Sequence, residues 1–155
     1  MGVKSTDVQG TKTYIVDVPA TKWADCAAAV TALEAGAEAL CTQSIGNLTR
    51  SRDITEYGCM SSDESTKSAG SIKYGDTTIE LLFDNDDATG QAALLKAFDD
   101  NESVIIGFKH SDGKTIVWSE GVLAGDEIAY PADGKVGYSV TVSWYGGFNR
   151  CTTTP

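Results

Sequence analysis

The chain has 155 residues, 41% of them apolar, and its 12 basic and 22 acidic side chains give a formal net charge of −10. This length fits one domain with its own core, and the apolar content argues against a disordered protein. The acid excess excludes most nucleic-acid binders and disfavours anionic membrane surfaces, because both require clustered Lys and Arg. We expect a single domain over residues 1–155, with 1–10 and 146–155 as extended arms.

The four cysteines, Cys26, Cys41, Cys59 and Cys151, are widely spaced. They contain no Cys-x-x-Cys pair, so a zinc site is not supported. The beginning of the chain lacks the apolar stretch of a signal peptide, and no segment is apolar enough to span a membrane. Three pairings of the cysteines are possible, but a cytosolic protein favours free, buried thiols.

The first third predicts a strand followed by a helix. Residues 11–18 alternate between polar and apolar side chains, and Pro19 ends the strand. Residues 21–35 are rich in alanine and carry apolar side chains at spacings of 3, 4 and 3, which predicts one helical face. Gly36 stands where a helix C′ residue is expected. The face consists of Trp23, Cys26, Val30 and Leu33.

The middle of the chain is less regular. Residues 37–58 predict one or two strands with a bend near Gly46. Residues 60–70 are small and polar and predict a loop. Residues 71–83 predict a strong strand whose pattern changes register at Gly75, as at a bulge or kink.

A short helix follows over residues 89–98, with Leu94, Leu95 and Phe98 as its apolar side chains. Asp86 or Asp87 is expected as its N-cap, since a carboxylate there accepts from free backbone N–H groups.

The last third reads as β structure. Residues 136–144 alternate most clearly, with Tyr138, Val140 and Val142 among the apolar positions and Gly, Ser and Thr between them. Before this strand we expect strands at 103–109 and 115–123, a hairpin turn at 112–113, a crossover at 125–131 and a turn at 133–134. The predicted fold class is mainly β: a β-sandwich, or rolled sheet, of about seven or eight strands. One α-helix flanks it, and a second short helix lies near the N-terminus.

No motif points to catalysis, to a cofactor or to a metal. His110 is the only histidine, and it lies beside Asp112 at the expected turn without a Gly-x-Ser-x-Gly motif. A phosphate-binding Gly-x-x-x-x-Gly-Lys loop is also missing from the sequence. The aromatic residues Trp118, Tyr138 and Trp144 could form a glycan-binding platform, although their place on strands favours core packing.

Several segments, taken in order, resemble one known family. They are LCTQSIG at 40–46, TR at 49–50, EYGCMSSDE at 56–64, Lys67, GSIKYG at 70–75, LLFD at 81–84 and GQAAL at 90–94. A strand ending in Leu-Phe-Asp, a helix opening with Gly-Gln and three hairpin strands together resemble the tail tube, or major tail, protein of long-tailed bacteriophages. The resemblance covers roughly residues 10–145, and it does not include Cys26 or Cys151.

The resemblance implies a structural virion protein without a catalytic site. Six copies would form a ring, and stacked rings would form a hollow tube through which DNA leaves the virion. DNA would be a transient passenger without specific binding, and other tail proteins such as a tape measure and a tail terminator would be partners. The protein would be located in the virion tail after assembly in the host cytoplasm.

The polar segment beginning at Met60, together with two aromatic residues near the C-terminus, is the candidate subunit interface. As a monomer, the same segment could be a mobile surface loop. Two alternatives remain: the tube protein of a secretion or contractile injection system, and a glycan-binding β-sandwich module. The interface candidates are Met60, Ser61, Ser62, Asp63, Glu64, Ser65, Thr66, Lys67, Tyr145 and Phe148.

Overall fold

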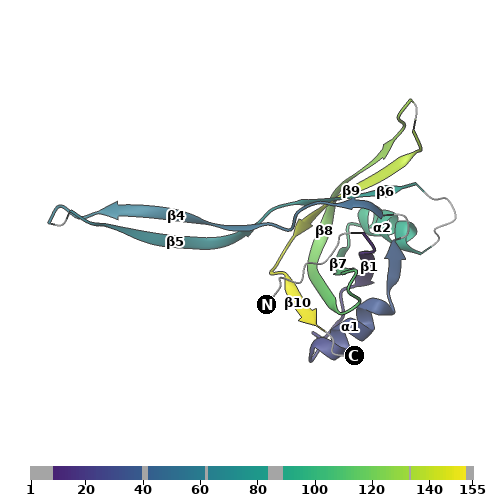
Figure 1. Cartoon of the computed structure of the whole chain (residues 1–155), viewed down its shortest axis with the longest axis horizontal. Coiled ribbons are helices and arrows are strands. Elements are labelled where there is room, and N and C mark those ends of the chain that lie inside the picture. The colour runs from purple at the N-terminus through teal and green to yellow at the C-terminus, as the bar shows by residue number, and fades with distance from the viewer. Residues whose placement is uncertain (1–8, 40–41, 62, 84–88, 133, 153–155) are drawn as a thin grey trace.

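The computed structural model describes residues 9–39, 42–61, 63–83, 89–132 and 134–152. It contains ten strands and two helices in these ranges (Figure 1). In chain order they are β1 Lys12–Asp17, α1 Cys26–Glu34, β2 Ala37–Ala39, β3 Thr42–Ile45, β4 Arg50–Gly58, β5 Ser65–Tyr74, β6 Thr77–Leu82, α2 Gly90–Asp99, β7 Ser103–Lys109, β8 Thr115–Ala129, β9 Gly137–Trp144 and β10 Asn149–Thr152.

Eight strands form one antiparallel sheet in the order β2-β1-β7-β8-β9-β6-β3, with β10 paired to β8. Strand β8 is 15 residues long and joins two halves of the sheet. Its first part pairs with β7 and β10, and its second part pairs with β9. The predicted mainly β, rolled sandwich with two helices is confirmed.

The main core lies between the two halves of the sheet and against α2. On β9 the predicted alternation is confirmed: Tyr138, Val140, Val142 and Trp144 are buried, and the residues between them are half-buried. Strand β7 contributes Val104, Ile106 and Phe108 to this core, while helix α2 adds Leu94 and Ala97.

A smaller core lies on the opposite side of β7, under α1. Val30 and Leu33 of the predicted helical face pack there against Ile116 and Cys151. The other two predicted residues differ: Trp23 precedes the helix, although it packs on this core, and Cys26 is exposed. The helix was expected over residues 21–35, but it begins only at Cys26. Asp25 is its N-cap and accepts a hydrogen bond from the Ala28 N–H at 2.8 Å.

Gly36 follows α1 at the expected C′ position, but its φ is not positive. A Cβ at this position would lie 2.5 Å from Val16 Cγ2 and 2.8 Å from the Ile15 carbonyl oxygen. Glycine is therefore required because the chain passes close to β1 as it enters β2.

The expectation of free cysteines was wrong for two of the four. Cys26 and Cys151 form a disulfide across a sequence separation of 125, with Cα atoms 5.5 Å apart. It links the first residue of α1 to β10, so residues 149–152, expected within an extended arm, form a strand on β8. Cys59 is free and exposed. Cys41, like residues 1–8 and 153–155, lies outside the described residues.

The prediction of a loop over 60–70 was largely wrong. Residues 65–74 form β5, which pairs with β4 in a long hairpin. The strand expected over 71–83 is two strands, because the Gly75 N–H donates to the Thr49 carbonyl and the chain passes from the hairpin into the sheet there. Near Gly46, where a bend was predicted, the chain leaves β3, and the Gly46 N–H donates to the Thr78 carbonyl. Residues 37–58 contain three strands rather than one or two.

Strand β8 continues to Ala129, where a crossover was expected. A register shift between Leu123 and Gly125 breaks its alternation, which hid the second half of the strand in the sequence. For α2 the N-cap is Thr89; Asp86 and Asp87 lie outside the described residues.

The predicted turn between β7 and β8 is confirmed, with Gly113 at φ 73°. The Asp112 carboxylate accepts from the Thr115 and Lys114 N–H groups and from the Thr115 hydroxyl. These hydrogen bonds, chiefly that from the Thr115 N–H, lower the pKa of Asp112. Asp112 is thus engaged in holding the turn.

Candidate assembly interface

The β4–β5 hairpin projects far from the body of the molecule (Figure 1). All nine residues of β4 and nine of the ten residues of β5 are exposed. Among them are large apolar side chains that a monomer gains nothing by exposing: Ile54 is 60% exposed, Tyr57 55% and Ile72 38%. Large apolar side chains exposed on a projecting ribbon are typical of a contact surface.

Residues that face each other across an antiparallel pair share one face of the ribbon. On one face Arg50 lies opposite Tyr74, Arg52 opposite Ile72, and Ile54 opposite Ala69. We call Arg50, Arg52, Ile54 and Ile72 the basic face; they line a hollow of about 550 Å³ together with Ser51. Arg52 Nη1 donates to the Gly70 carbonyl at 3.0 Å, which orients its guanidinium.

The other face of the hairpin consists mainly of hydroxyl side chains. Ser51 lies opposite Lys73, Thr55 opposite Ser68, and Tyr57 opposite Thr66. The only charges among these pairs and Asp53 form an exposed ion pair between Lys73 and Asp53. The two faces of the same hairpin therefore differ in chemistry: one is polar and close to neutral, while the other is basic and apolar.

The predicted interface segment falls on the tip and the beginning of β5. Met60 and Ser61 lie in the turn, where Met60 is fully exposed, and Asp63 and Glu64 follow. Ser62 lies outside the described residues. In β5, Ser65 hydrogen-bonds Glu56, Lys67 lies opposite Glu56, and Thr66 lies on the hydroxyl face.

The two aromatic candidates lie elsewhere, at the end of β9. Tyr145 is 57% exposed, and its hydroxyl is 3.3 Å from Ser103 Oγ. Phe148 is half-buried and makes edge contacts with Tyr74 and Trp144. Phe148 therefore supports the base of the hairpin within its own chain.

Arg50, Arg52, Ile54 and Ile72 were absent from the predicted interface, although the sequence contains their signal. Residues 50–57 read Arg-Ser-Arg-Asp-Ile-Thr-Glu-Tyr, in which Arg50, Arg52 and Ile54 stand at every second position, the period of a strand. The pattern differs from that of a buried strand because arginine takes the place of an apolar residue.

A second polar surface covers the outer side of β3, β6, β9 and β8. We call it the polar sheet face: Ser44, Thr78, Glu80, Glu127, Ser139, Thr141 and Ser143. Thr78 and Thr141 hydroxyls are 3.4 Å apart, and Ser44 Oγ donates to Glu80 Oε2 at 3.0 Å. Both charged residues of this face are glutamates, so it is weakly acidic.

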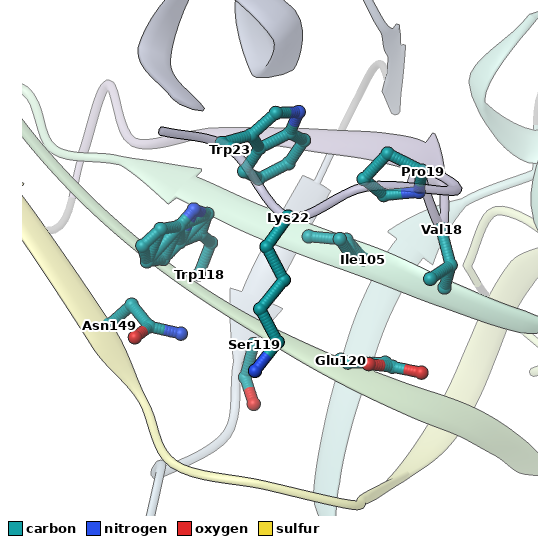
Figure 2. A pocket seen from close by; sticks show the side chains of 9 residues that line it. All are labelled: Val18, Pro19, Lys22, Trp23, Ile105, Trp118, Ser119, Glu120 and Asn149. Atoms are coloured by element: carbon teal, nitrogen blue, oxygen red, sulfur yellow. The ribbon is translucent and has the colours of Figure 1, made fainter. Parts of the chain in front are cut away.

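The aromatic platform suggested for glycans does not form. Tyr138 is 1% exposed and Trp144 is 6% exposed, and Trp144 Nε1 donates to Thr77 Oγ1 at 2.8 Å within the core. Trp118 instead stacks on Trp23 with ring centroids 6.0 Å apart. Figure 2 shows Trp23 and Trp118 among the side chains around one small hollow. The hollow has a volume of about 260 Å³, and Lys22 and Glu120 also line it.

No helix within the described ranges is long and apolar enough to cross a membrane. His110 is half-buried at the end of β7, where its backbone N–H donates to the Thr115 carbonyl. Its position is that of a turn residue.

No family model and no curated protein matches the sequence. Solved structures do match in fold. A chain of the SPP1 tail tube aligns with a TM-score of 0.68 at 12% identity, covering 97% of this chain and 81% of that one. A chain of the anti-feeding prophage baseplate also gives a TM-score of 0.68, at 9% identity, and covers 98% of each chain.

A chain from the PVC extracellular contractile injection system, solved as its sheath/tube terminator, aligns with a TM-score of 0.62 at 11% identity. That alignment covers 96% of this chain and 97% of the other. At such identities the likeness establishes the fold. The chain therefore has the fold of a phage tail tube protein, one that also occurs in contractile injection systems.

Proposed function

We propose that this protein is a structural subunit that assembles with copies of itself into stacked hexameric rings, forming a tail tube that conducts DNA. The observation that carries the proposal is the alignment with a chain of the SPP1 tail tube over 97% of this chain. Six-fold assembly is supported by the tail of a gene transfer agent refined with C6 symmetry, whose chain aligns with a TM-score of 0.55 at 14% identity.

The apolar side chains exposed on the hairpin support self-assembly. A monomer gains no stability from Ile54 and Ile72 at these exposures, whereas burial between copies would remove them from water. Contacts between non-equivalent surfaces close into rings or continue as filaments, and sheet edges covered by a neighbour no longer invite disordered aggregation. The candidate contacts from residues 60–67, Tyr145 and Phe148 remain part of this proposal.

The polar sheet face is the proposed lining of the lumen. It offers hydroxyl groups and two glutamates, and this combination does not hold DNA phosphates. A ring of six would multiply the −10 charge of one chain, and any part of it at the lumen would keep a passing duplex mobile by repulsion. The acid excess therefore suits a conduit for DNA.

Electron microscopy of the purified full chain at increasing concentration tests the proposal. We expect the purified chain to form rings or tubes of uniform diameter. In the complete tail, its partners would be tape measure and tail terminator proteins. Monomers alone at high concentration would contradict it. Ile54→Ala should reduce tube formation. The matched control is Thr55→Ala, on the hydroxyl face of the same strand, which should leave tube formation nearly unchanged.

The tube of a bacterial contractile injection system is the second candidate. It is favoured by the alignments with the anti-feeding prophage and PVC chains, which cover nearly the whole of each chain. Neighbouring genes distinguish the two: a sheath gene next to this one would indicate the contractile system, and its absence a long, flexible phage tail.

A further inference from the structure

The two arginines of the basic face stand out against the charge of the rest of the molecule. The strands β4 and β5 contain four basic residues, Arg50, Arg52, Lys67 and Lys73, and two acidic ones, Asp53 and Glu56, which leaves them at +2. The whole chain is at −10. The turn between them adds Asp63 and Glu64, so the positive charge is confined to the strands, where Arg50 and Arg52 lie on the basic face. That face is therefore attracted to acidic surfaces of an identical chain, and a second copy is the partner that its charge favours.

The exposed side chains of the basic face limit which surface of the second copy it can bind. Ile54 and Ile72 lie on it with 60% and 38% of their surface exposed. Exposed apolar side chains of this kind fit an apolar hollow on the partner, which removes them from water. The arginines beside them fit best where a helix ends, because the C-terminal end of a helix is the negative end of its dipole.

Helix α2 meets these requirements. Ala92 is exposed on it, while Ala93 is half-buried and packs against the main core. A hollow of about 410 Å³ lies beside it, with an apolar floor that includes Ile15, Ala97 and Val104. We call this hollow and the adjoining end of the helix the α2 groove.

Carboxylates surround the C-terminal end of the α2 groove. Asp17 and Glu102 line the hollow, and Asp100 follows the last residue of the helix. All three residues are exposed, and one lysine, Lys96, lies among them. Helix α1 is less suitable, because Glu34 near its C-terminus is already paired with Lys109 at 2.7 Å.

We propose that the basic face of the β4–β5 hairpin binds the α2 groove of a second copy, with Arg50 and Arg52 against the carboxylates of Asp17, Asp100 and Glu102. Ile54 and Ile72 fill the apolar hollow beside the helix. The hydroxyl face of the hairpin, on the opposite side, then stays free. This proposal rests on the proposed self-assembly and assigns the two surfaces that meet in it.

Charge reversal tests the assignment in the full chain. Arg50→Glu/Arg52→Glu and Asp100→Lys/Glu102→Lys should each raise the concentration at which assemblies form by about tenfold or more, because like charges then face each other. Combining the four substitutions restores the charge pairing and should bring that concentration back to within about threefold of the wild-type value. Electron microscopy and sedimentation velocity measure the assembled fraction, and thermal melting checks that each exposed variant still folds.

A matched control separates pairing from net charge. Arg50→Glu/Arg52→Glu combined with Glu80→Lys/Glu127→Lys has the same net charge as the rescued variant, but its new lysines lie on the polar sheet face. It should not recover assembly. Recovery by both combinations, or by neither, would overturn the pairing with the α2 groove, as would normal assembly of Arg50→Glu/Arg52→Glu alone.

The same experiment distinguishes the two proposals. If the wild-type chain forms tubes and the reversals do not follow the pattern above, the docking surfaces are wrong and the tube function stands. If the wild-type chain forms no assembly at any concentration, the proposed function itself fails, and the docking proposal fails with it.

Discussion

The body of the molecule and the β4–β5 hairpin are both antiparallel β structure, but their strands have different surroundings. In β9 one face is completely buried and the other half-buried, whereas in β4 both faces are exposed. The body is thus held by its own core, while the hairpin is held by its ladder of hydrogen bonds and by its base, where Tyr74 packs on Phe148. Substitutions in the two regions should therefore act on different properties: folding in the body and assembly in the hairpin.

The largest expected effect is in the main core. Ile106 is completely buried between the sheet halves, and Ile106→Ala should lower the free energy of unfolding by about 2–5 kcal/mol through lost burial and a residual cavity. Chemical denaturation of the monomer measures it. If Ile106→Ala lowered the free energy of unfolding as little as is expected for Ile54→Ala, the body and the hairpin would not differ in their contribution to folding.

Next comes the disulfide that fastens β10 to α1. Cys26→Ser should lower the free energy of unfolding by about 2–4 kcal/mol, since the bond closes a long loop in the unfolded chain. The control is Cys59→Ser, which changes a free, exposed thiol at the hairpin tip and should leave the melting temperature unchanged. Equal melting of wild type and Cys26→Ser without reductant would mean that the bond does not form.

A smaller effect is expected at the beginning of α1. Asp25→Ala removes the hydrogen bond to the Ala28 N–H and should cost about 1 kcal/mol of stability. Asp25→Asn keeps an acceptor and should cost much less, so comparing the two by thermal melting isolates the cap from the charge. An equal loss in both variants would assign the effect to the carboxylate charge.

The smallest effect on folding is expected in the hairpin. Ile54→Ala should change the free energy of unfolding of the monomer by no more than about 0.5 kcal/mol, because its side chain already faces water. The same variant should lower the amount of assembled protein seen by electron microscopy. Destabilisation comparable to Ile106→Ala would show that the hairpin face is part of the monomer's own core.

The elements that the sequence predicts correctly are those whose own side-chain pattern reflects which side is buried. The alternation of β9 and the apolar face of α1 reflect burial on one side, so sequence periodicity predicts both. Strand β5 has no buried face along most of its length, and its Ser, Thr, Gly and Lys residues read as a loop. In β8, the irregularity after Leu123 interrupts the period and hides the continuation of the strand.

The interface predicted from the sequence does not include the basic face, for a related reason. The prediction places the contact at the polar segment beginning at Met60, whereas the basic face depends on which residues lie opposite each other. Arg52 and Ile72 are 20 positions apart and share a face because of the hairpin register. One segment of the sequence taken alone does not predict this pairing.

By itself, the sequence determined the mainly β class, the two helices, the buried strand β9 and the acidic charge, because composition and local periodicity are properties of neighbouring residues. Tertiary structure decided the rest. It brought Cys26 to Cys151, added β10 to β8, and separated the hairpin into a basic and a hydroxyl face. Those features depend on contacts between distant segments, which form only when the sheet folds around its core and fixes the register of its strands.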